Sequence, residues 1–281
     1  MRTLYILILA SVLLYSCSTD EGYYSYLSRP DAAAEAIQLK LSTTTTDAEF
    51  YYRLQAKEMY IEWGDNSKPT EYIFTGNDNL LDSIKPTSKI YNSQGTFDIN
   101  IKSLNLVKLD LSKTDNASSK NRYNSISELI LTDCRNLEDL RFTGQPITTV
   151  DLSECTTLIA LYCGYNEGTQ SVTGLENLTK LETLNITGKL SSSTIDLSAN
   201  VLLKNITVTA SNCETINIGN NPVLETVVLT NNLSLNAAAL NTLFAALPQV
   251  TGTEHTVTLA GNNGDSLCDK TIATQKGWIF K

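Results

Sequence analysis

The stretches ISELILTDC (126–134) and ITTVDLSEC (147–155) share one pattern, and this pattern decides the fold. Apolar residues stand at the first, fourth and sixth places of both stretches, and a cysteine stands at the ninth. These cysteines, Cys134 and Cys155, are 21 residues apart. The spacing leaves three interpretations open for them: a disulfide, part of a metal site, or one repeated position of a periodic structure.

The first six places of this pattern recur along the chain. The windows begin at residues 106, 126, 137, 147, 158, 181, 203, 213 and 224, and a window at 192 fits except at its first place. Successive starts from residue 126 are separated by 10 or 11 residues, apart from one step of 23. Two windows therefore make a unit of about 21 residues, which is the size of one coil in several repeat proteins.

This run resembles the leucine-rich-repeat pattern L-x-x-L-x-L-x-x-N/C-x-L. The resemblance implies a flattened solenoid over residues 104–235, in which each coil carries two short strands on opposite sides. Apolar side chains would point inward and the alternate side chains outward. Because one coil cannot bury its own apolar face, stability would come from the stacking of neighbouring coils.

The windows fall into two alternating sets. Set A begins at residues 106, 126, 147, 192 and 213, and set B begins at 137, 158, 181, 203 and 224. The ninth place is Cys or Asn more often in set A, at Cys134, Cys155, Asn200 and Asn221. We expect these four side chains to form an inward-facing ladder that satisfies backbone groups where the strands bend. We also expect set A to form the principal sheet, with its missing strand between residues 158 and 181.

The ladder is favoured over the other two interpretations of the paired cysteines. The chain has no C-x-x-C pair, so a zinc site is not expected. Five cysteines, an odd number, remain when Cys17 is set aside. A disulfide between Cys134 and Cys155 stays open, because equivalent positions of neighbouring coils lie about 4.8 Å apart, near the separation that a disulfide requires.

Residues 35–103 have a different pattern, in which apolar and polar residues alternate. Such alternation predicts antiparallel strands with one buried face. Within this part, YIEWGDN (60–66) and KIYNSQGTFDINI (89–101) resemble two signature segments of PKD-type immunoglobulin-like domains. The resemblance implies a β-sandwich that serves as a spacer or adhesion module, with Trp63 in its core and Asp65 holding a turn.

Residues 236–281 resemble the C-terminal end of bacterial surface leucine-rich-repeat lipoproteins. NAAALNTLFAALP (236–248) has leucines at helical spacing before a proline, HTVTL (255–259) alternates like a strand, and 269–277 has the length of a short helix. The resemblance implies a small α/β cap that covers the last coil. The fold class is therefore mainly β: a PKD-like sandwich, a leucine-rich-repeat solenoid and a C-terminal cap.

The first residues predict export. MRTLYILILASVLLYSC (1–17) has a basic residue, a short apolar run and small residues before a cysteine, as a signal peptide does. LYSC (14–17) resembles a bacterial lipobox, which implies a signal peptide over 1–16, lipidation of Cys17 and a tether over 17–34. The resemblance further implies an outer-membrane lipoprotein, held by its N-terminal lipid only and facing the cell exterior, since acidic residues follow Cys17 as in surface-export tags.

Composition and motifs exclude several functions. The chain carries a net charge of −9 and no basic cluster, so nucleic acid is not an expected partner. Its one histidine, His255, lies in the predicted cap, and motifs for nucleophilic, metal-dependent or nucleotide-dependent catalysis are absent from the sequence. GNNGDS (261–266) could offer oxygen ligands to calcium, but turn formation is the favoured explanation. We therefore expect no enzyme activity, no cofactor and no metal.

The fifth place of each window points outward and is the candidate binding surface. Set A has acidic residues there, at Asp110, Asp151 and Asp196, and set B has Arg141 and Tyr162, with Tyr165 close by in sequence. Arg and Tyr are typical of interface hot spots. The sequence predicts a monomeric surface lipoprotein that binds a protein or glycan ligand. The alternative is an accessory protein that captures glycans for a surface uptake system, and an enzyme of unknown type is the third hypothesis.

Overall fold

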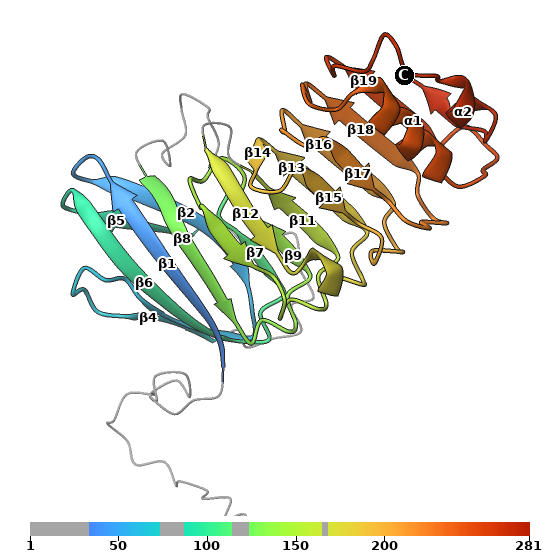
Figure 1. Cartoon of the computed structure of the whole chain (residues 1–281). Coiled ribbons are helices and arrows are strands. Elements are labelled where there is room, and N and C mark those ends of the chain that lie inside the picture. Colours follow the sequence, from blue (N-terminus) through green and yellow to red (C-terminus); the bar gives the residue numbers. More distant parts are fainter. Residues whose placement is uncertain (1–33, 74–86, 114–123, 165–167) are drawn as a thin grey trace, which may run out of the picture.

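The computed structural model describes residues 34–73, 87–113, 124–164 and 168–281 (Figure 1). Strands make up 43% of the residues that the structure describes and helices 8%, so the prediction of a mainly β class is confirmed. The predicted signal peptide, the lipidation site Cys17 and the candidate binding residue Tyr165 lie outside the described residues.

The N-terminal part consists of antiparallel strands in two layers. Its strands are β1 (Glu35–Thr43), β2 (Ala48–Gln55), β3 (Glu58–Glu62), β4 (Thr70–Ile73), β5 (Thr87–Tyr91), β6 (Gly95–Leu104) and, later in the chain, β8 (Asn124–Thr132). One sheet has the order β4-β3-β6-β1-β8, and β2 pairs with β5 in the other. In β1, Ile37, Leu39 and Leu41 are buried between the layers while the alternate side chains face outward, as the period of two requires.

Aromatic residues hold these two layers together. The rings of Tyr52 on β2 and Trp63 after β3 lie 5.8 Å apart between centroids. Trp63 donates its indole N–H to Thr70 at 2.8 Å, and the hydroxyl of Tyr91 donates to the backbone carbonyl of Trp63 at 3.0 Å. Asp65 accepts the backbone N–H of Ser67 at 3.0 Å, which closes the turn after Trp63. Both Trp63 and Asp65 therefore have structural contacts.

A long row of parallel strands continues from this part to the C-terminus (Figure 1). Its strands are β7 (Lys108–Asp110), β9 (Asp139–Arg141), β11 (Ala160–Cys163), β13 (Thr183–Thr187), β16 (Asn205–Thr209), β18 (Thr226–Thr230), β19 (Thr256–Ala260) and β20 (Ile279–Phe280). Together with β2 and β5 they form one ten-stranded sheet. The second residue of each parallel strand is an apolar residue in register with its neighbours, such as Leu140, Leu161 and Leu184, and all three are fully buried.

Shorter strands form the opposite layer. They are β10 (Thr149–Asp151), β12 (Thr169–Thr173) and β14 (Lys189–Leu190) in one parallel sheet, and β15 (Thr194–Asp196) and β17 (Thr215–Asn217) in another. A 3₁₀ turn, η3 (Leu175–Asn177), follows β12. The strand expected in the 23-residue step is β12, since it pairs in parallel with β10. The two layers enclose a continuous apolar core.

The prediction that set A forms the principal sheet is wrong. All five set B strands lie in the ten-stranded sheet, while set A is divided: β7 joins that sheet, β8 pairs antiparallel with β1, and the others lie in the short sheets. The strands of the short sheets and those of the ten-stranded sheet also differ in length. In β10 and β15 an aspartate at the fifth place of the window accepts the backbone N–H two residues further on, which bends the chain after three residues. β13, β16 and β18 carry no such turn and run for five residues.

The two parts of the molecule share sheet and core. Strand β2 pairs antiparallel with β7, so the ten-stranded sheet crosses the predicted boundary at residues 103–104. A buried carboxylate, that of Glu35 at the start of β1, lies at the same junction. It accepts hydrogen bonds from the backbone N–H of Leu106 at 2.7 Å and from the side-chain amide of Asn136 at 2.8 Å.

Two helices close the C-terminal end. Helix α1 (Ala237–Ala246) begins at Asn236, whose side chain accepts the N–H of Ala239 at 3.0 Å, a standard N-cap. It lies in the layer of the short strands, against β17 (Figure 1). Helix α2 (Thr271–Thr274) is shorter than the predicted 269–277. Trp278 is buried and donates its indole N–H to the carbonyl of Pro248 at 2.9 Å, which ties the last strand to α1.

Candidate functional site

The four predicted ladder residues are all buried at the turns that lead from set A to set B. Cys134, Cys155, Asn200 and Asn221 have no exposed surface. The N–H of Leu158 donates to the carbonyl of Cys155 at 3.0 Å, and the N–H of Leu203 donates to that of Asn200 at 3.2 Å. The amide group of Asn200 also donates to the carbonyls of Leu175 and Leu178 in the preceding coil. The four residues therefore lie at equivalent bends, the Asn200 side chain satisfies backbone carbonyls there, and all four are inaccessible to a ligand.

The cysteines in the described part of the chain are free thiols. Burial raises the pKa of Cys134, Cys155 and Cys163 to about 12, and a thiol at such a pKa is a poor nucleophile near neutrality. Among the residues that the structure describes, no group of three or more His, Cys, Asp or Glu side chains could hold a metal ion.

A second buried polar ladder on the set B side was missed by the sequence reasoning. Asn232 accepts hydrogen bonds from the N–H of Ser211 at 2.9 Å and its hydroxyl at 2.8 Å, and donates to the carbonyl of Val208 at 2.9 Å. Asn262 does the same one coil later, accepting from Asn232 and donating to Leu229 at 2.7 Å. The sequence feature that could have indicated this ladder is Asn232, at the ninth place of the set B window that begins at residue 224. Cys and Asn are more frequent at that place in set A, so set A alone was predicted to form a ladder.

The three aspartates of set A do not form one acidic column. Asp110 lies on β7 in the ten-stranded sheet, Asp151 on β10 and Asp196 on β15, and these strands belong to three different sheets. Each carboxylate accepts the backbone N–H of the serine two residues further on, at 3.0 Å. The recurring triplet Asp-Leu-Ser, visible in the sequence, thus serves to end strands.

These hydrogen bonds also change the acidity of two of the aspartates. The backbone N–H of Ser153 lowers the pKa of Asp151, and the hydrogen bonds from Ser198 lower the pKa of Asp196. Asp151 and Asp196 therefore stay charged at any physiological pH.

Asp151 lines a groove where two sheets end side by side. Strand β8 is the last strand of the five-stranded sheet and β10 is the last of its three-stranded sheet. Between them lies a cavity of about 560 Å³, lined also by Ile130, Thr149 and the ion pair of Lys40 with Glu128, which are 2.6 Å apart. Ile130 is 42% exposed. The groove is large enough for a small ligand, but its one charged pair is already satisfied.

The set B candidates do come together, on the outward face of the ten-stranded sheet. Arg141 on β9 is directly opposite Tyr162 on β11, and its guanidinium carbon lies 4.2 Å from the centre of the tyrosine ring. Asp139 fixes the guanidinium from the side through two hydrogen bonds of 2.8 Å. The hydrogen bonds that Arg141 donates to Asp139 raise the pKa of Arg141. The Tyr162 ring therefore packs against the Arg141 guanidinium, whose position is fixed by its hydrogen bonds to Asp139.

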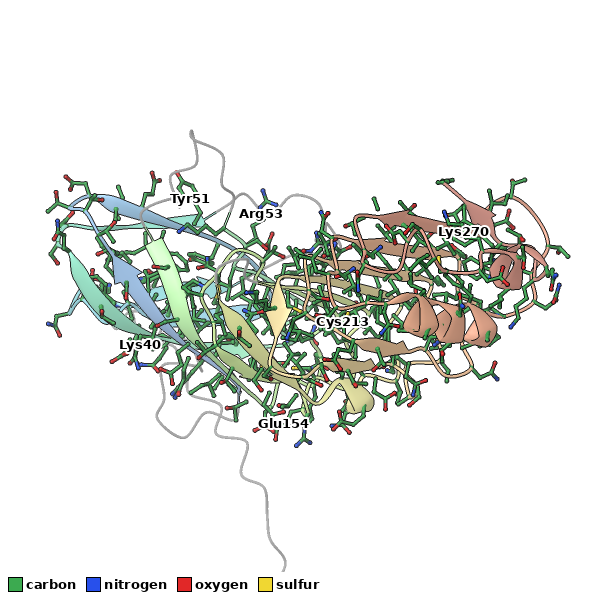
Figure 2. The ribbon with its side chains drawn as sticks, turned by 45° about the horizontal axis from the view of Figure 1, so that its top comes forward. Lys40, Tyr51, Arg53, Glu154, Cys213 and Lys270 are labelled. Atoms are coloured by element: carbon green, nitrogen blue, oxygen red, sulfur yellow. The ribbon has the colours of Figure 1, made fainter. Side chains whose placement is uncertain are left out.

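The row of paired outward residues that contains Arg141 and Tyr162 continues into the N-terminal part. Asp110 is opposite Arg141 on one side and opposite Arg53 of β2 on the other, and Arg53 approaches Asp110 to 3.7 Å. Arg53 was not identified from sequence, because only the pairing of β2 with β7 brings it here. In Figure 2, Arg53 and Tyr51 stand on one side of the molecule, while Lys40 and Glu154 lie on the opposite side. The row and the groove are therefore separate sites.

His255 is held within the C-terminal part. Its Nδ1 atom lies 3.0 Å from the carbonyl oxygen of Leu224, and its ring packs edge-on against Trp278 at 5.5 Å. Only 15% of the side chain is exposed. These contacts indicate that His255 has a structural role in packing.

Comparisons with known proteins give no family. No protein-family model, curated protein or solved structure matches the chain. Within the described ranges, no helix has the length and apolar character needed to cross a lipid bilayer.

Proposed function

We propose that the protein is a non-catalytic lipoprotein of the cell surface that binds a ligand through the outward face of its ten-stranded sheet. In this proposal the parallel strands belong to a leucine-rich-repeat solenoid, and β1 to β6 with β8 form a PKD-like sandwich before it. The periodic core and the bend ladders at Cys155 and Asn200 support the first assignment. The Trp63 and Asp65 contacts support the second.

The observation that carries the proposal is the stacked pair of Arg141 and Tyr162. Arg and Tyr, together with Trp, are enriched among the residues that contribute most to binding energy at interfaces. Here both lie on an open face, with the Arg141 side chain 40% exposed, and both are already ordered by Asp139 and by each other. Because little side-chain entropy remains to be lost, such a pair favours association with a partner.

The proposal also includes the location. Cys17 would carry the lipid, residues 17–34 would form a tether, and the membrane would be contacted through this lipid alone. The protein would be a monomer on the outer membrane, facing the exterior. A Cys17→Ala variant is expected to leave the membrane fraction, and protease added to intact cells is expected to digest the wild-type chain. A variant that still partitions with membranes would refute the anchor.

The binding proposal is tested by presenting the full chain to an array of glycans and purified extracellular proteins. Each ligand that binds is then measured with Tyr162→Ala and with Tyr60→Ala, a matched control on β3 of the other sheet. We expect at least one ligand whose affinity falls about tenfold, or 1.4 kcal/mol, with the first variant and stays unchanged with the second. The proposal fails if every ligand binds both variants equally, or if none binds at all.

A further inference from the structure

The ten-stranded sheet presents an uncharged field next to Tyr162. Strands β13, β16 and β18 point nine side chains outward, and each of these is half-buried. Six of the nine are threonines: Thr183, Thr187, Thr207, Thr209, Thr226 and Thr230. The other three are two asparagines and one valine, so no outward position on these strands carries a charge.

Strict register makes this field a regular grid. Tyr162 is opposite Asn185, Asn185 is opposite Thr207, and Thr207 is opposite Val228. Neighbouring strands are about 4.8 Å apart, and successive outward residues on one strand are about 6.7 Å apart. Hydroxyl groups and amides, each able to donate and accept, therefore recur at constant intervals along the sheet.

Several of the charges beside the field are paired with one another. Arg141 is bound by Asp139, and Arg53 lies against Asp110. At the start of the strands, Lys204 pairs with Glu182 at 2.8 Å. An ionic ligand would find no unpaired partner among these groups, and a polyanion would also be repelled by the net charge of −9.

Tyr162 adds an apolar surface at the border of the field. The guanidinium of Arg141 lies over one face of the ring, so the other face is turned towards β13, where the short side chain of Asn185 follows in the row. An aromatic face next to hydroxyl and amide groups suits a ligand that has apolar C–H surfaces and hydroxyl groups on the same unit. Sugar rings have this chemistry, and a polysaccharide repeats it.

We propose that the ligand of this face is an uncharged polysaccharide, laid across the strands from Tyr162 over the threonine field. This inference rests on the proposed function and narrows its ligand class. A protein partner is less suited to the field, because the centre of a protein interface is apolar and rich in aromatic residues. On β13, β16 and β18 the outward positions offer one valine and no aromatic side chain.

The test uses the full chain in native gels that contain neutral polysaccharides (a mixed-linkage β-glucan, a galactomannan and an arabinoxylan). Parallel gels contain the acidic polymers polygalacturonate and hyaluronan. We expect retardation by at least one neutral polymer. Calorimetry of that polymer is expected to give an affinity that changes less than about twofold between low and high salt, since screening acts only on charged partners.

Three variants locate the binding. Tyr162→Ala is expected to weaken binding about tenfold, while Tyr162→Phe, which keeps the ring, stays within about threefold of wild type. Thr207→Lys places a charge in the field and is expected to weaken binding about tenfold. Thr215→Lys is the matched control, because Thr215 is an exposed threonine on β17 in the opposite layer.

The outcomes separate the inference from the proposed function. Binding of acidic polymers alone, with loss at high salt, would overturn the inference, as would equal effects of Thr207→Lys and Thr215→Lys. If no neutral polymer binds but a purified protein binds in a manner sensitive to Tyr162→Ala, the inference fails and the proposed function stands. If nothing that binds is sensitive to Tyr162→Ala, both fail.

Discussion

Many polar side chains in this protein form hydrogen bonds with backbone groups. The aspartate of each Asp-Leu-Ser triplet accepts a backbone N–H and ends a strand, and Asn217 does the same for Gly219 at 3.1 Å. The amide of Asn217 shows that the carbonyl-type oxygen, and not the charge, is what the turn requires. These outward side chains therefore have a structural role that their outward position alone did not indicate.

Asp151 offers a direct test of this role. Asp151→Ala should destabilise the fold by about 1 kcal/mol, the usual value of one hydrogen bond, whereas Asp151→Asn, which keeps an acceptor oxygen but not the charge, should destabilise it less at pH 7. Because the pKa of Asp151 is lowered in the folded state, its charge contributes stability above the ordinary carboxyl pKa and loses it as the pH falls through the folded pKa.

Urea unfolding at several pH values measures both effects for Asp151. The Asn variant should lack the acid-sensitive part that the wild type shows. Equal stability of the Ala and Asn variants would contradict the turn assignment.

The cysteines lead to a second prediction. Cys134, Cys155, Cys163 and Cys213 are buried, and burial raises the pKa of each thiol, whereas Cys268 is half-buried. Alkylation of the native chain at mildly alkaline pH, followed by peptide mass spectrometry, should modify Cys268 first and leave the four others protected. Unfolded protein is the control, in which all five should react alike. Native labelling of Cys163 at the rate of Cys268 would disprove its burial.

At the scale of elements, the Asp-Leu-Ser turns end short strands such as β10 and β15 after three residues. Set A and set B have the same apolar pattern, so the period and the core residues were readable from sequence. The pairing partners of the strands were not readable from sequence. Strand β8 has the same window as β10 and yet pairs with β1 over nearly its whole length. Its choice depends on an unpaired edge of β1, which is a property of the assembled sandwich. The meeting of Arg53 with Asp110 follows from the same topology.

The asparagine ladder on the set B side should be the costliest element to break. Asn232→Ala leaves the N–H of Ser211 and the carbonyl of Val208 buried without their partner. Since each unsatisfied buried group costs about 1–3 kcal/mol, we expect a loss of roughly 2–4 kcal/mol in denaturant unfolding. Asn220→Ala, at an exposed asparagine of a neighbouring turn, is the control and should change little. Similar losses for both variants would argue against the ladder.

At the scale of the whole molecule, the two parts are expected to unfold together. They share the ten-stranded sheet, a continuous core and the buried carboxylate of Glu35. Glu35→Gln replaces one acceptor oxygen by a donor that faces either Leu106 N–H or the Asn136 amide. It should lower the unfolding free energy by about 1–3 kcal/mol and shift one single transition.

The control for Glu35→Gln is Glu62→Gln, an exposed glutamate on β3. Circular dichroism, which reports on all strands, and fluorescence of Trp63 and Trp278, which reports on the two ends, should give the same midpoint. A variant in which the two signals separate would show that the parts fold independently.

The position of β1 has a mechanical consequence. Tension applied from the N-terminal side enters the described fold at Glu35, and β1 lies between β6 and β8 with antiparallel pairing along both sides. A pull along the strand loads the hydrogen bonds of both ladders at the same time, in shear, so they must break together instead of one after another.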